Sequence, residues 1–133
     1  MTVGLDNGLC AKNIKRKDIP NWVKPPWDWN EWDNEQEIVY FRKHWGIRGE
    51  ILAKLHCNDD NDSNTPVDEE DIIPIVKILF KYLDKEYYDE NADSILEYEQ
   101  AYEHIQQSII NLMWLKMYME SHPDVECYFY DSW

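Results

Sequence analysis

The sequence predicts a mainly α-helical protein of the α+β class, with a three-helix core and a small β element from its N- and C-terminal segments. Three observations lead to this expectation. Apolar residues recur at three- and four-residue steps, capping residues precede those stretches, and both ends of the chain carry strand-forming runs. A length of 133 residues with 44% hydrophobic residues fits one domain, so we expect a single domain over 1–133, with an arm at 1–34, a helical core at 35–121 and a strand at 124–130.

Residues 1–34 are the least regular part of the sequence. Asp6 and Asn7 between two glycines predict a turn joining two short extended pieces. Three prolines within seven residues then exclude a helix around residue 22. The four tryptophans of this segment are costly to leave in water, so we expect it to lie across the helices as an ordered arm.

The first expected helix follows residue 33 and covers about 20 residues. Its apolar face consists of residues spaced by three and four, with one arginine among them: Ile38, Phe41, Trp45, Arg48, Leu52 and Leu55. Gly46 and Gly49 weaken the helix, and we therefore expect another backbone to approach closely at both positions.

The second expected helix begins near Asp71, which places Pro74 in the first turn, where its missing N–H is harmless. Residues 84–93 break the helical pattern. A capping box at Ser94 begins the third and longest helix, and Pro123 ends it. We expect the C-terminal strand to pair with one of the extended N-terminal pieces.

Charge divides the chain into two unequal parts. The net charge is -14, and residues 1–54 hold nine basic against eight acidic residues, whereas residues 55–133 hold four against nineteen. Phosphate repels such a protein, which argues against direct nucleic-acid binding. A fixed carboxylate array instead attracts proteins that normally bind nucleic acids. The candidate partner-binding residues are Asp68, Glu69, Glu70, Asp71, Asp89, Glu90 and Glu97. Ordinary solubility charge is the alternative interpretation.

A basic and aromatic cluster offers a second candidate site, formed by Arg42, Lys43, Trp45 and Arg48. Guanidinium groups beside an aromatic ring can hold a phosphate or a nucleotide base. The alternative is that these cations neutralise the acidic part of the chain. Arg48 falls on the apolar stripe and needs a partner if it is buried.

No catalytic, cofactor-binding or metal motif stands out, and we predict a non-enzymatic protein without cofactor or metal. Three cysteines without a framework spacing fit a reducing compartment. The loops 60–71 and 89–100 have the ligand spacing of EF-hands but lack the turn glycine and the final glutamate. Helix capping is the alternative for both loops. Without a long apolar run or a signal peptide, the expected location is cytoplasmic.

The opening TVGLDNG at residues 2–8 and the run EIVYFRKHWGIR at 37–48 resemble small proteins encoded by phages and prophages of low-GC Gram-positive bacteria. The resemblance implies a bacterial cytosol and an accessory role, and among such proteins small acidic folds resemble anti-CRISPR and other counter-defence inhibitors. The expected function is therefore binding and inhibition of a host defence component, a nucleic-acid-binding protein such as a CRISPR effector. Two alternatives stay open: a sponge for a nucleotide immune signal, and a virion or assembly protein that forms a homo-oligomer.

Overall fold

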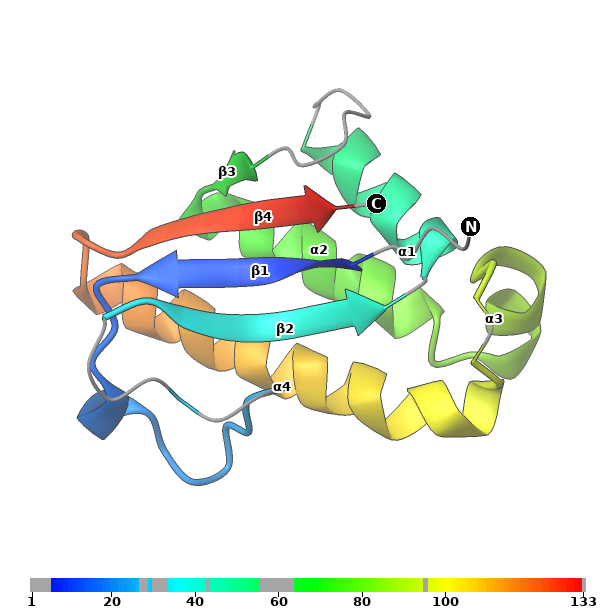
Figure 1. Ribbon diagram of the computed structural model, residues 1–133, viewed down its shortest axis with the longest axis horizontal. Coiled ribbons are helices and arrows are strands. Elements are labelled where there is room, and N and C mark those ends of the chain that lie inside the picture. Colours follow the sequence, from blue (N-terminus) through cyan, green and yellow to red (C-terminus); the bar gives the residue numbers. More distant parts are fainter. Residues whose placement is uncertain are drawn as a thin grey trace.

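The computed structural model describes residues 6–26, 29, 34–42, 44–55, 64–94 and 96–132. This part of the chain forms an α+β fold with four α-helices and a four-stranded antiparallel sheet (Figure 1). In chain order the elements are β1 (Asp6–Lys12), the 3-10 turn η1 (Arg16–Asp18), β2 (Gln36–Arg42), α1 (Trp45–Lys54), β3 (Asn64–Val67), α2 (Glu69–Lys81), α3 (Lys85–Asn91), α4 (Tyr98–Ser121) and β4 (Glu126–Ser132).

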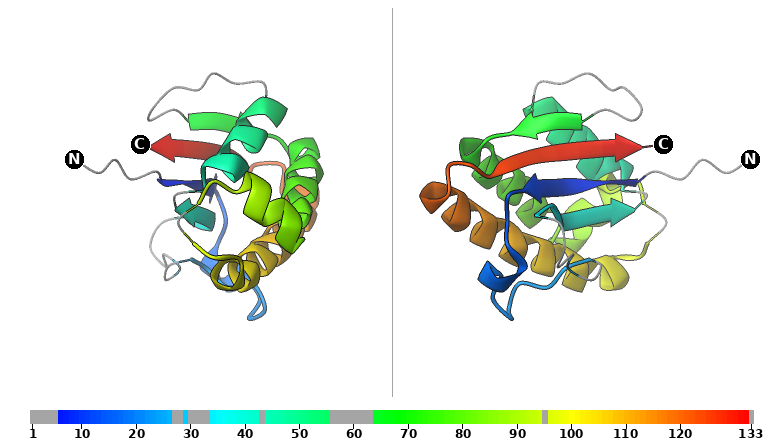
Figure 2. Two further views of the ribbon diagram at one scale, coloured as in Figure 1. Left: turned by 90° about the vertical axis from the view of Figure 1, so that its right-hand side faces the viewer. Right: turned by 60° about the vertical axis from the view of Figure 1, so that its left-hand side comes forward.

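The four-stranded sheet is one of the two layers of the fold, so the expectation of a three-helix core with a small β element is wrong. The strand order is β2-β1-β4-β3, which puts the two terminal strands in the middle. The helices lie on one side of the sheet, with α2 and α4 running antiparallel across it (Figures 1 and 2). The core between the two layers includes Leu9, Phe41 and Phe129 from the sheet and Ile75, Leu79 and Leu112 from the helices, all fully buried.

The segment predicted as the first helix contains the strand β2 and the shorter helix α1. In the β1–β2 register Leu9 faces Val39 but Cys10 faces Glu37, so Ile38 is an extra residue in a β-bulge. Ile38 and Phe41 are therefore both buried although they stand three residues apart. A strand without a bulge would give steps of two. The bulge thus produced a spacing that imitates a helix.

Gly46 in α1 lies against the end of α3. A Cβ at this position would stand 1.9 Å from the carbonyl oxygen of Asn91, and the Gly46 N–H donates to the carbonyl of Ala92 at 3.0 Å. The expectation of a close backbone is confirmed here. It is wrong for Gly49, where a Cβ would meet nothing within 4 Å.

Helix α2 is confirmed but begins earlier than expected. Its first residue is Glu69 and its N-cap is Asp68, whose N–H donates to the Asp71 carboxylate at 2.9 Å. Asp71 thus caps the helix from its third position rather than from in front of it. Pro74 consequently lies in the second turn.

The third expected helix corresponds to α4, which starts at Tyr98 with Glu97 as N-cap and ends at Ser121, before Pro123. Residues 84–93, for which the pattern predicted no helix, contain α3. Its N-cap Asp84 accepts a hydrogen bond from the Tyr87 N–H at 2.9 Å. A helix of seven residues, about two turns, is too short for an apolar stripe to show in the sequence.

The predicted C-terminal strand is confirmed as β4, and it pairs with β1 from Asp6 to Lys12. The turn expected around Asp6 and Asn7 is wrong, because β1 runs straight through these residues. Gly8 is needed in the strand for a different reason. A Cβ there would stand 2.2 Å from the carbonyl oxygen of Val39 and 3.1 Å from the Tyr130 ring.

The described part of the arm packs along α4 beside the edge of β2. The amide of Asn111, 2% exposed, accepts a hydrogen bond from the Lys24 N–H at 3.2 Å and donates to the carbonyls of Lys24 at 2.6 Å and Ile38 at 3.0 Å. His104 of α4 bonds the carbonyl of Tyr40 in the same strand. Two carbonyls of the β2 edge are thus satisfied by helix side chains, which protects that edge from pairing with another chain.

The tryptophans of the arm differ in their environments. Trp29 packs against the core, whereas Trp22 is 54% exposed. Trp27 and Trp32 lie outside the described residues.

Candidate functional site

The outer face of the sheet, which points away from the helices, presents rows of side chains from neighbouring strands. The register places Lys12 opposite Glu126, Cys10 between Glu37 and Tyr128, and Gly8 between Tyr40 and Tyr130. In the part of the chain that the structure describes, no helix covers this face (Figure 2). The face therefore combines tyrosine rings with carboxylates at solvent-accessible positions.

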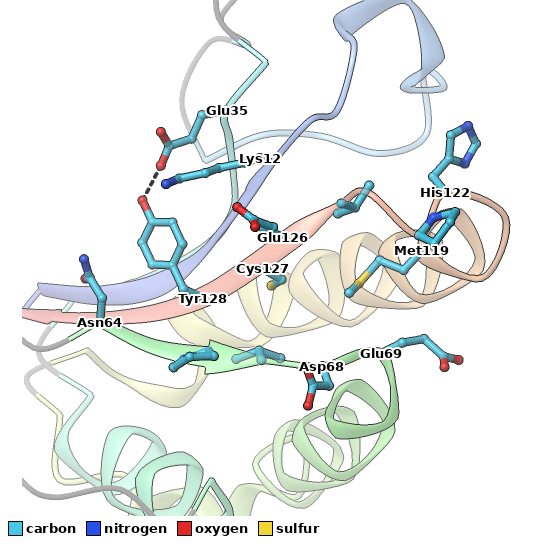
Figure 3. A pocket seen from close by; sticks show the side chains of 14 residues that line it. Lys12, Glu35, Asn64, Asp68, Glu69, Met119, His122, Glu126, Cys127 and Tyr128 are labelled. Atoms are coloured by element: carbon cyan, nitrogen blue, oxygen red, sulfur yellow. Dashed lines mark hydrogen bonds between the residues drawn. The ribbon is translucent and has the colours of Figure 1, made fainter.

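A cleft of about 730 Å³, here called the acidic cleft, opens at one end of this face (Figure 3). It arises because β3 is only four residues long: its last pair is Val67 with Cys127, and the next residue, Asp68, already caps α2. Strand β4 extends further toward α4 without a partner on that side. The lining residues are Lys12, Glu35, Asn64, Pro66, Val67, Asp68, Glu69, Met119, His122, Pro123, Val125, Glu126, Cys127 and Tyr128.

Negative charge dominates the rim of the acidic cleft. Its carboxylates are Glu35, Asp68, Glu69 and Glu126, and its lysine is Lys12. Lys116 approaches from α4 and pairs with Glu69 at 3.0 Å, but the same ammonium also pairs with Glu120. Valine, proline and methionine side chains supply apolar surface between the charged groups. An apolar floor with a negative rim suits an amphipathic, positively charged ligand.

Tyr128 connects the cleft to the outer face. Its hydroxyl donates a hydrogen bond to the Glu35 carboxylate, and the Lys12 Nζ lies 5.8 Å from the centre of its ring (Figure 3). Burial and the hydrogen bond to Glu35 raise the pKa of Tyr128, so its hydroxyl remains a donor at neutral pH. The Glu35 side chain is exposed.

The acidic residues predicted from the sequence fall into two groups at opposite ends of α2. Asp68, Glu69, Glu70 and Asp71 surround its first turn, and Asp68 and Glu69 line the acidic cleft. Asp89, Glu90 and Glu97 lie at the far end, on α3 and before α4. Asp89 and Glu97 line a second cleft of about 490 Å³. Since α2 is 13 residues long, about 20 Å separates the two groups, which do not form one surface.

The basic and aromatic cluster does not form an open pocket at its arginine. Arg48 is 4% exposed, and its guanidinium carbon lies 5.5 Å from the centre of the Trp45 ring. Arg42 is the last residue of β2, with its side chain outside the description, and Lys43 lies outside the described residues. Arg48 is therefore a buried part of the fold rather than a ligand-facing cation.

Two histidines in the same region pack against Phe41, and of these His44 is buried and His104 is half-buried. The rings of His44 and His104 meet Phe41 edge-on, with centroids 6.3 and 5.9 Å away. Burial, reinforced by His104, lowers the pKa of His44 to about 4. Among the described residues, the Nδ1 of His44 has no hydrogen-bond partner, and neither has either amide atom of the fully buried Asn7. Protonation of His44 would place a charge in this buried region, which makes it sensitive to acid.

Among the described residues, no group of three or more His, Cys, Asp or Glu side chains could hold a metal ion. Residues 60–63 of the first EF-hand-like loop, and Cys57, lie outside that part of the chain. Burial and Glu37 raise the pKa of Cys10 to about 12, and burial raises the pKa of Cys127 still further. Both thiols are consequently protonated at neutral pH.

Lys12, Glu35, Tyr128 and the rest of the outer face were not among the site residues predicted from the sequence. The strand alternation at 126–130 was visible, and it implies that Glu126, Tyr128 and Tyr130 share one side. What the sequence could not provide was the neighbouring strand. Reading residues 35–42 as helix removed Glu35 and Glu37 from the sheet.

Comparisons with protein-family models, with curated proteins and with solved structures each found no match. In the described part of the chain, no helix is both long and apolar enough to cross a membrane.

Proposed function

We propose that this protein is a non-enzymatic accessory protein that binds a basic segment of another protein in the acidic cleft. The partner is a host defence component that binds nucleic acid, and the interaction inhibits it by occupying its phosphate-binding surface. The observation that carries this proposal is the cleft itself, where four carboxylates and one lysine surround an apolar floor. Carboxylates in such an arrangement attract a basic partner over long distances, while the floor accepts the apolar part of its side chains.

The biological setting follows from the sequence resemblance to phage and prophage proteins. A phage accessory protein acts in the cytoplasm of its bacterial host, where nucleic-acid-binding defence proteins act against the phage. Their phosphate-binding surfaces are rich in lysine and arginine, which complements the charge of -14 on this chain.

The test compares capture of proteins from a defence-proficient bacterial lysate by the wild type and two charge-matched variants. The cleft variant is Asp68→Asn with Glu69→Gln, in which asparagine preserves the helix cap. The control is Glu86→Gln with Glu103→Gln, which removes two exposed carboxylates from α3 and α4.

We expect a nucleic-acid-binding protein to be captured by the wild type and the control and lost from the cleft variant. High salt should release it, and adding this protein should displace its nucleic acid. Equal capture by both variants, or a captured protein that keeps its nucleic acid, would contradict the proposal.

A second candidate is the assembly role, because the solvent side of the helix layer exposes large apolar side chains. Phe80 of α2 is 55% exposed, and on α4 Met113 and Met117 are 39% and 60% exposed. Exposed apolar side chains of this kind can mediate self-association. Light scattering of the wild type and of Met117→Lys would show an oligomer that the substitution dissociates; a monomer at all concentrations would exclude it.

A further inference from the structure

The acidic cleft contains one cation with an unusual position. Lys12 stands opposite Glu126 in the β1–β4 register and reaches diagonally toward the Tyr128 ring, two residues further along β4. On its other side lies Glu35, which holds the Tyr128 hydroxyl. Within the described residues Lys12 forms no ion pair, although two carboxylates flank it. Its ammonium group instead lies 5.8 Å from the centre of the ring.

We infer that Tyr128, Glu35 and Glu126 form a subsite for an arginine side chain of the bound partner, and that Lys12 occupies this subsite as an internal competitor until the partner displaces it. This inference rests on the proposed function, because the arginine belongs to the same basic segment that enters the acidic cleft. It adds that the bound side chain is an arginine and that Lys12 tunes the affinity for it.

The chemistry of the subsite favours a cation. The electron-rich face of a tyrosine ring attracts a positive charge, and the carboxylates on either side add a Coulombic contribution. Lys12 shows that an ammonium group fits against the ring. Because Lys12 is exposed and carries a flexible side chain, it can leave without disturbing the sheet.

Arginine suits this arrangement better than lysine. A planar guanidinium can stack on the ring and still donate two parallel hydrogen bonds to a carboxylate at its edge. The ammonium of a lysine is a compact, strongly hydrated point charge, which offers neither a flat face to the ring nor a fixed pair of donors to the carboxylate. The subsite is also continuous with the cleft, since Lys12, Glu35, Glu126 and Tyr128 all line it.

The test uses a short fluorescein-labelled peptide in which arginine alternates with serine, together with the same peptide carrying lysine, and fluorescence anisotropy as the readout. Replacing Lys12 by alanine should tighten binding of the arginine peptide about fivefold, as expected when a ligand no longer displaces a cation–π contact. Lys17→Ala removes the same charge from the exposed η1 turn and should change affinity less than twofold. Tyr128→Leu should weaken binding about fivefold, whereas Tyr128→Phe, which keeps the ring, should weaken it far less.

Proton NMR gives a direct view of the displacement. The ε-methylene signal of Lys12 should be shifted upfield by the Tyr128 ring in the free protein and should return to its ordinary position when the arginine peptide saturates the site. An unshifted signal, or one that the peptide does not move, would overturn the role of Lys12. Weaker peptide binding after Lys12→Ala would also overturn it, because Lys12 would then contribute to binding.

The outcomes separate this inference from the proposed function. If the arginine peptide binds and requires Asp68 and Glu69 but ignores Lys12 and Tyr128, the cleft stands and the subsite is wrong. Equal affinity for the arginine and lysine peptides would contradict the preference for arginine but would leave the subsite and the proposed function in place. If neither peptide binds, the proposed function itself fails.

Discussion

Replacing Asn111 by alanine is expected to destabilise the protein strongly, because this amide joins three parts of the fold. It satisfies the N–H and carbonyl of Lys24 in the arm and the carbonyl of Ile38 in β2, from a position in α4 that is 2% exposed. The substitution leaves three backbone groups without partners. At about 1 kcal/mol for each group, the free energy of unfolding should fall by about 3 kcal/mol. A domain of this size has a total of roughly 5–15 kcal/mol.

Urea unfolding followed by far-UV circular dichroism measures this loss. With a slope typical of small domains, the midpoint should fall by about 1.5 M. The control is Gln106→Ala on the same helix, whose exposed side-chain amide donates, within the described residues, one hydrogen bond, to the Tyr102 hydroxyl at 3.2 Å. It should change the stability by less than about 0.5 kcal/mol. If Asn111→Ala unfolds within that same margin of the wild type, the arm does not depend on this amide and the reasoning is refuted.

Three further predictions concern α1 and its neighbours. Gly46→Ala should lower the free energy of unfolding by more than about 2 kcal/mol, because a Cβ would stand 1.9 Å from the Asn91 carbonyl oxygen. Gly49→Ala, where a Cβ meets open space, should raise it by roughly 0.5–1 kcal/mol. Thermal unfolding of the two variants should therefore show changes of opposite sign. The pKa of His44 lies at about 4 in the folded protein and near 6.5 in the unfolded chain, so the free energy of unfolding should fall by up to about 3 kcal/mol as the pH falls from 6.5 toward 4. His44→Phe should flatten this decline in melting temperatures measured over a series of pH values. An unchanged pH profile would argue against a neutral buried ring. Burial raises the pKa of Glu50, but hydrogen bonds from Lys81, Tyr82 and Tyr87 outweigh this effect and hold the pKa below its usual 4.5. The ionised Glu50 therefore stabilises the fold above pH 4.5, and this contribution is lost as the pH falls below that value. Glu50→Gln should accordingly make the melting temperature less sensitive to acid.

The fold could be predicted from the sequence where local signals agree with tertiary structure. The helices α2 and α4 carry capping residues and a continuous apolar stripe, and β4 carries alternating strand formers, so all three were recognisable. Strand β2 was misread because the bulge at Ile38 spaces its buried residues by three. A bulge forms against a neighbouring strand, and β1 lies far away in the sequence.

The candidate site was predictable in its chemistry but not in its geometry. The excess of acidic residues after residue 55 indicated a surface for a basic partner. Composition alone could not show that α2 holds Asp68 and Asp89 at opposite ends of the helix layer. It also could not show that a short β3 opens a cleft, or that Lys12 from β1 enters it. These features depend on strand register, which the sequence specifies only through long-range pairing.

The central claim is that a basic segment binds in the acidic cleft, and an amide chemical-shift map tests it most directly. The measurement titrates nitrogen-15-labelled protein with the arginine peptide at low salt. We expect the largest shifts at Val67, Asp68 and residues 126–128, around the cleft, and we expect Asp68→Asn with Glu69→Gln to reduce them. Shifts concentrated instead at Asp89 and Glu97, or on the outer side of α4, would contradict it.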